Sequence, residues 1–239
     1  MLHSAPGIGK STWAANSDRP VFIQTEDGLS GLPNVDTFPL AKSYDEVMEA
    51  ISSLYVEQHD YKTVVIDSAD WLELLIVNKV CEDENVQSIE KISYGRGHVF
   101  AMNYWRTVID GLNALRNDRM MSVIVLCHTD IKRVSDPTMP EYDTNTLKLH
   151  KRASAILEEW ADVILYATVQ TNTISEESGF SGKRVRAVTT GQRIVHTVGQ
   201  PAFLAKSRFN LPPVMPLDWP TFKQALQDAK RPDMQNKPF

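Results

Sequence analysis

The chain has 239 residues, 42% of them hydrophobic and 23% charged, with a formal net charge of −5. This length allows one large domain with a full core, and the charge does not mark the whole chain as a nucleic-acid binder. The two cysteines lack the spacing of a disulfide framework or a zinc site, which predicts reduced thiols. We also find no signal peptide and no apolar run of membrane-spanning length. Together these features predict a cytoplasmic protein with no membrane partner.

Charge is unevenly distributed along the chain. The first 60 residues lean acidic, whereas residues 183–208 hold basic residues and no acidic one. Such a segment indicates either an anionic partner on one face of the protein or a solvated basic edge.

The first recognisable element is SAPGIGKST, residues 4–12. Gly9-Lys10-Ser11 fits the end of a phosphate loop, but Ser4 stands where the pattern has its first glycine. Such a loop joins a strand to a helix, and only three residues precede this one, so we expect a first strand that is very short or truncated. A glycine-rich turn is the alternative.

If the loop is a phosphate loop, its chemistry follows from the residue types. Glycines let the backbone turn several N–H groups inward, a lysine reaches the β- and γ-phosphates, and a serine ligates Mg²⁺. The pattern therefore predicts ATP and Mg²⁺ as cofactors, with Lys10 and Ser11 in those two roles. The predicted nucleotide-binding residues are Pro6, Gly7, Ile8, Gly9, Lys10, Ser11 and Thr12.

Beyond the loop, short β-branched runs alternate with helical patterns. The expected strands lie at residues 21–23, 64–66, 123–126 and 163–166, and the expected helices cover 44–54, 105–115 and 153–160. Strands that are apolar throughout and separated by amphipathic helices indicate an α/β fold with a mostly parallel sheet flanked by helices. We expect a single domain over residues 1–230.

Three of these strands end in polar residues. Asp67 closes the apolar run of KTVVIDSADWL, as a Mg²⁺-binding Walker B aspartate does, or else merely starts the next helix. Glu26, in VFIQTEDGL, is placed to orient the attacking water, with Asp27 as the alternative acid. His128, in VIVLCHTD, is either a sensor of the γ-phosphate or a structural histidine.

The C-terminal third changes in style. Residues 186–189 and 193–198 flank Thr190-Gly191-Gln192, which predicts an antiparallel hairpin at the sheet edge. In LAKSRFNLP, Lys206 and Arg208 are two residues apart and so share a strand face, as an arginine-finger pair or an exposed basic pair. A last helix is expected over 219–230, followed by a flexible tail, 231–239.

Taken in order, PGIGKST, VFIQTEDGL, VVIDSADWL, VIVLCHTDIK, WADVILY and LAKSRFNLP resemble the RecA-like AAA-type ATPases of phages, over roughly residues 1–219. That family includes proteins that act in single-strand annealing and recombination. The resemblance implies a RecA-like P-loop NTPase in which Glu26 is the catalytic base. It also implies a homo-oligomeric ring or filament in which Lys206 and Arg208 act on a neighbour's nucleotide.

The same resemblance implies single-stranded DNA as a partner, bound by two loops. These are residues 88–98, with Tyr94 and Arg96, and residues 130–149, with Lys132 and Arg133. Exposed aromatic and basic side chains suit base stacking and phosphate contact. A replication motor or helicase loader, and a nucleotide-binding module with weak hydrolysis, remain alternatives. If the chain is phage-encoded, its location is the host bacterial cytoplasm.

Overall fold

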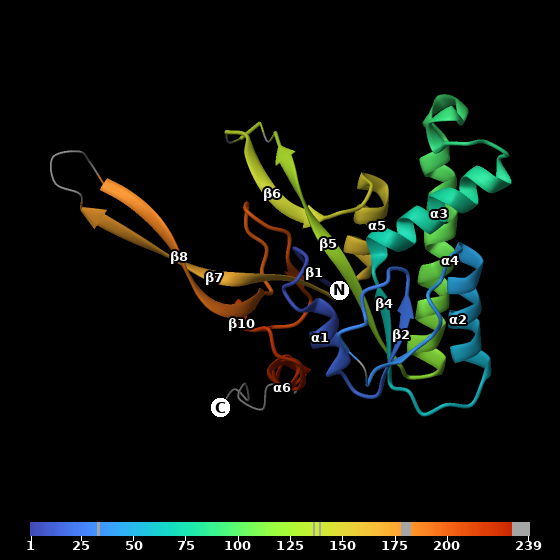
Figure 1. The fold of residues 1–239 in the computed structure, drawn as a ribbon, viewed down its shortest axis with the longest axis horizontal. Helices are drawn as coiled ribbons and strands as arrows, with labels where there is room; N and C mark the ends of the chain where they lie inside the picture. The colour runs from blue at the N-terminus through green and yellow to red at the C-terminus, as the bar shows by residue number, and fades with distance from the viewer. Residues whose placement is uncertain (33, 136, 139, 178–182, 231–239) are drawn as a thin grey trace, which may run out of the picture.

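The computed structural model describes residues 1–32, 34–135, 137–138, 140–177 and 183–230, so the predicted tail lies outside the described residues. Figure 1 shows the arrangement of the elements. In chain order they are β1 (Leu2–Ser4), α1 (Lys10–Ala15), β2 (Pro20–Gln24), β3 (Asp36–Thr37), α2 (Tyr44–Val56), β4 (Thr63–Asp67), α3 (Ala69–Asp83), η1 (Ile89–Lys91), η2 (Ser93–Gly95), α4 (Gly97–Asp118), β5 (Ser122–Val134), β6 (Tyr142–Leu147), α5 (Lys151–Trp160), β7 (Val163–Glu177), β8 (Lys183–His196), β9 (Lys206–Ser207), β10 (Val214–Pro216) and α6 (Trp219–Lys230).

The strands form one mixed sheet in the order β10-β8-β7-β1-β5-β4-β2-β3. All neighbours from β7 to β3 run parallel, and β8 and β10 add antiparallel strands at the other edge. The predicted fold class, a mostly parallel sheet with a C-terminal antiparallel hairpin, is confirmed. The carboxyl ends of β1, β5, β4 and β2 therefore meet at one edge of the sheet.

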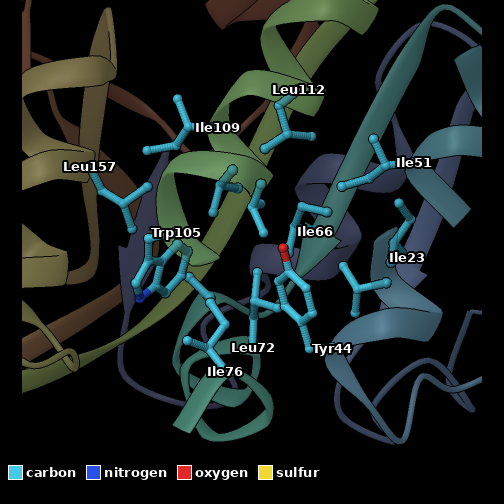
Figure 2. Packing of buried hydrophobic residues seen from close by; sticks show 14 of the residues in the cluster. Ile23, Tyr44, Ile51, Ile66, Leu72, Ile76, Trp105, Ile109, Leu112 and Leu157 are labelled. Atoms are coloured by element: carbon cyan, nitrogen blue, oxygen red, sulfur yellow. The ribbon is translucent and has the colours of Figure 1, made fainter. Parts of the chain in front are cut away.

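Helices cover both faces of the sheet because its central strands are apolar on both sides. In β4 all five residues are buried, and successive side chains point to opposite faces. Val64 and Ile66 pack in the cluster beneath α2, α3, α4 and α5, whereas Val65 packs in the cluster that contains Trp13 of α1 and Phe222 of α6. Figure 2 shows the first cluster, in which Trp105 lies close to Ile109 and Leu157.

The predicted helices are present, with longer bounds for α2, α4 and α5 and unchanged bounds for α6. At the start of α2, Oγ of Ser43 accepts a hydrogen bond from the N–H of Glu46 at 3.2 Å, which is a typical N-cap. None of the described helices combines the length and apolar character that crossing a membrane requires.

The predicted position of the hairpin turn is wrong. Residues 190–192 lie within β8, where the register against β7 shifts between Val169 and Thr171 and Gly191 has φ 77°. This is a β-bulge, which needs the same conformational freedom as a turn. The hairpin of β7 and β8 is connected across residues 178–182, outside the described residues.

The predicted second DNA loop is largely a β-hairpin and not an irregular loop. β5 continues past the parallel sheet, and its residues Thr129 to Val134 pair with β6. In Figure 1 the β5–β6 and β7–β8 ribbons both extend away from the body of the protein. The apolar pattern of the sequence does not predict these strand extensions, because their residues are largely polar. A strand that lies outside the core needs no apolar run.

Candidate active site

The loop between β1 and α1 has the backbone that its glycines permit. Gly7 has φ 79° and Gly9 has φ 106°, both in the left-handed region that other residues avoid. Ser4, in place of the first glycine of the pattern, is fully buried, and its Oγ donates to the carbonyl of Ala5 at 2.8 Å. The serine is thus accommodated within the loop, with its hydroxyl satisfied locally.

Lys10 and Ser11 open α1 beside the end of β4. Lys10 is only 6% exposed, and burial lowers the pKa of its ammonium, an effect opposed by the carboxylates of Asp67, Glu26 and Asp70. Ser11 Oγ donates to Oδ2 of Asp67 at 2.6 Å. The structure therefore brings together the two motifs that the sequence predicted to share Mg²⁺.

Asp67 is 3% exposed, and its second oxygen, Oδ1, has no hydrogen-bond partner among the described residues. Burial raises the pKa of Asp67, and the hydrogen bond from Ser11 counters that rise. A buried carboxylate oxygen without a partner is costly unless a cation or donor satisfies it. Because hard divalent cations prefer oxygen ligands, Ser11 and Asp67 fit Mg²⁺.

Glu26 and His128 also meet at this edge. Nε2 of His128 lies 3.9 Å from Oε1 of Glu26, and Nδ1 lies 2.9 Å from Oδ2 of Asp70. His128 does not end its strand as predicted: it sits opposite Ser4 of β1, where β5 leaves the parallel sheet. Burial raises the pKa of Glu26, whereas Asp27 is exposed, so the geometry favours Glu26 over the alternative acid.

Asp70 is a site residue that the sequence reasoning missed. Burial alone would raise its pKa, but hydrogen bonds from the side chain and backbone N–H of His128, with the histidine's charge, lower that pKa to about 2. The backbone bond, from the N–H of His128 to Oδ1, measures 3.0 Å. An acid three residues after Asp67 was the available signal, but in sequence it looks like an ordinary first-turn acid of a helix.

Thr25 fixes the distance between the Glu26 and Asp67 segments. Its Oγ1 donates to the carbonyl of Ser68 at 2.7 Å and accepts from the N–H of Ser68 at 2.8 Å. Its own N–H donates to the carbonyl of Asp67 at 2.8 Å. The ends of β2 and β4 are thus held together directly beneath the two carboxylates.

A family model described as "AAA domain" matches residues 1–209. The chain belongs to the AAA domain family. The match spans the phosphate loop, Asp67 and His128, and it identifies the chain as an AAA-type, nucleotide-binding ATPase domain. No curated protein matches the chain. Among solved structures, the flagellar accessory protein FlaH from Methanocaldococcus jannaschii is similar over 84% of this chain and 84% of its own, at 11% identity and a TM-score of 0.32.

Lys206 and Arg208 of this AAA domain lie away from its own phosphate loop. β9 pairs with the start of β7, at the edge of the sheet opposite the carboxylates. Lys206 Nζ donates to the carbonyl of Glu158 at 2.5 Å, and Arg208 donates to Asp162 Oδ1 at 2.7 Å and to the carbonyl of Glu159 at 2.7 Å. Both side chains thus cap the C-terminal end of α5 by donating to its last carbonyls. Their action on a neighbouring subunit stays a prediction.

The predicted DNA-binding residues of the AAA domain differ in their surroundings. Tyr94 is 97% exposed, at φ 59°, and the guanidinium of Arg96 lies 5.9 Å from the ring centre of Phe100. Lys132 Nζ, by contrast, donates to the carbonyl of Leu149 at 2.8 Å, and Arg133 is paired with Glu141 at 2.7 Å. The first segment is thus the freer of the two for a ligand.

Proposed function

We propose that the chain is a Mg²⁺-dependent ATPase that acts on single-stranded DNA in phage recombination or strand annealing, as a homo-oligomeric ring or filament. The observation that carries the ATPase part is the meeting of Lys10, Ser11, Asp67, Glu26 and His128 at one sheet edge. In this proposal Lys10 is the cation for the phosphates, Ser11 and Asp67 are the metal-binding pair, and Glu26 is the base, with His128 3.9 Å from it.

Each residue has a distinct task in hydrolysis. The backbone at Gly7 and Gly9 turns its N–H groups toward the phosphates, and the buried ammonium of Lys10 attracts their negative charge. Ser11 and Asp67 would hold Mg²⁺, which would supply positive charge against the triphosphate. Glu26 orients water and takes its proton, and a pKa raised by burial makes it a stronger base than an exposed glutamate.

His128 has two neighbours of different kinds. Asp70 accepts from Nδ1 and fixes the ring, so Nε2 faces Glu26 at 3.9 Å, close to where the γ-phosphate of a bound nucleotide would lie. In this position His128 can donate a hydrogen bond either to the γ-phosphate or to Glu26. We infer that it reports which nucleotide is bound by exchanging between these two partners.

The DNA part of the proposal rests on the segment with Tyr94. Ile89 and Ile92 are buried, 6% and 5% exposed, and anchor the two 3₁₀ turns of this segment. Tyr94 itself points into solvent on this fixed base, next to Arg96. An exposed aromatic ring close to a guanidinium suits stacking with a base and contact with a phosphate.

A chain of packed residues joins this segment to the nucleotide site. His98, two residues after Arg96, stacks on His150 with ring centres 3.8 Å apart and planes 3° apart. The N–H of His150 donates to Glu73 Oε2 at 2.9 Å, and Glu73 lies one helical turn after Asp70 on α3. We infer that DNA bound at Arg96 acts on His128 through these contacts and so stimulates hydrolysis.

The experiment measures ATP turnover and DNA binding with a long oligo(dT). We expect stimulation in the parent and binding that weakens as salt rises. Tyr94→Ala should lower DNA affinity by about tenfold, since stacking contributes roughly 1–3 kcal/mol per base. Tyr55→Ala, which removes another exposed tyrosine on α2, is the matched control.

Three outcomes separate the parts of the proposal. Turnover without any DNA effect would retain the ATPase and remove the DNA role. Equal DNA affinity for Tyr94→Ala and Tyr55→Ala would move the DNA site elsewhere. Strand annealing without unwinding is expected, and the reverse result would favour a motor or loader.

A further inference from the structure

The phosphate loop touches a cation that its motif does not include. A Cβ atom built on Gly9 would lie 3.0 Å from Nη1 of Arg193, so the guanidinium rests against the loop. Arg193 belongs to β8. In the sheet, β7 and β8 lie on one side of β1, and β5, β4 and β2 lie on its other side. Arg193 therefore approaches Gly9 from the side opposite Asp67 and Glu26.

The backbone of Arg193 is held in place on both sides. It pairs with Val169 of β7, directly after the bulge at Gly191. Its carbonyl accepts from the N–H of Leu217 at 3.0 Å, just beyond β10. The bulge changes the direction of β8 at this point, and the contacts with β7 and Leu217 hold the backbone of Arg193 in that direction. The side chain therefore extends from a preorganised backbone position.

The guanidinium is also free to bind an anion. Arg193 is exposed, and within the described part of the chain no carboxylate lies at ion-pairing distance from it. Arg208 and Arg133, by contrast, each pair with a carboxylate at 2.7 Å. A planar guanidinium donates well-directed, charge-assisted hydrogen bonds to phosphate oxygens.

We propose that Arg193 binds the α-phosphate of the nucleotide within the same chain, an inference that rests on the proposed function. Ser11 and Asp67, which would hold Mg²⁺ for the β- and γ-phosphates, lie on the other side of the loop. The side that faces Arg193 is left for the α-phosphate. Because ATP and ADP share this group and hydrolysis does not change it, the contact contributes to affinity and not to the chemical step.

The test compares MgATP and MgADP binding by calorimetry, together with kcat, in three variants. Arg193→Ala should weaken binding of both nucleotides by about tenfold, the effect of one charge-assisted hydrogen bond, and leave kcat within about twofold of the parent. Arg193→Lys should restore part of the affinity. Arg106→Ala removes the same charge from an exposed site on α4 and should bind both nucleotides like the parent.

The contradicting outcomes are distinct. Parental affinity of Arg193→Ala for both nucleotides would overturn the assignment while leaving the proposed function intact. Normal affinity with a steep fall in kcat would place Arg193 at the γ-phosphate instead and also overturn it. If the parent binds neither MgATP nor MgADP, the proposed function itself is wrong.

Discussion

Replacing Asp70 by asparagine removes the charge behind His128 while keeping the shape of the side chain. Asp70 is 6% exposed and accepts two hydrogen bonds from His128, at 3.0 Å from the backbone and 2.9 Å from the ring. The asparagine side chain would retain one acceptor oxygen, so the change isolates the contribution of the carboxylate charge. We expect a loss of folding stability together with a fall in kcat, because one remaining oxygen cannot accept from both donors of His128 as the two carboxylate oxygens do.

The size of the loss follows from the pKa of Asp70. Its lowering from 3.8 to about 2 corresponds to about 2 kcal/mol of folding free energy. The sign is that of a depressed acid: the contribution is complete above the unfolded pKa of 3.8 and disappears as pH falls toward 2. For a chain of this length, about 2 kcal/mol shifts Tm by roughly 4–8 °C.

The assay is guanidinium unfolding of parent and Asp70→Asn at about pH 5 and again at about pH 3, followed by tryptophan fluorescence. The difference in unfolding free energy should be about 2 kcal/mol at the higher pH and smaller at the lower. Asp60→Asn, which breaks an ion pair of Arg19 at a site where Asp60 is 72% exposed, is the control and should change little. Equal stability of Asp70→Asn and parent at pH 5, or a difference that does not shrink at pH 3, would refute the reasoning.

Two further predictions concern hydrolysis. Glu26→Gln should bind MgATP like the parent but lower turnover by roughly 10² or more, because the base is lost and the shape is kept; normal turnover would assign the role to another acid. Arg208→Ala should leave nucleotide binding nearly intact and lower turnover steeply if Arg208 completes a neighbour's site. Mixing it with Glu26→Gln should then restore part of the activity, and the absence of rescue would argue for a monomer.

Much of the site could be predicted from the sequence because its residues follow apolar runs. Glu26, Asp67 and His128 each come after a buried strand segment, and parallel strands bring their carboxyl ends to one edge. Lys10 and Ser11 were identified by the spacing of the phosphate loop. For such residues, local pattern and sheet direction together were sufficient.

The residues that were missed depend on contacts between distant segments. Asp70 is recognisable only once β5 places His128 against α3, and Arg193 only once β8 crosses beside Gly9. The bulge at Gly191 was interpreted as a turn because a glycine at positive φ serves both structures. Neither the contact partner of a side chain nor the position of a β-bulge produces a periodic pattern in a single sequence.

The most direct test of the nucleotide site is the stabilisation of the protein by MgATP, measured as a shift of Tm in the parent and in Lys10→Ala. Ligand binding to the folded state contributes RT ln(1 + [L]/Kd), about 2.7 kcal/mol at 100 times Kd. We predict this stabilisation in the parent and its loss in Lys10→Ala, because our proposal makes the buried ammonium of Lys10, beside Asp67, a main cation for the phosphates. An equal shift in the two proteins would contradict the assignment of the phosphate loop.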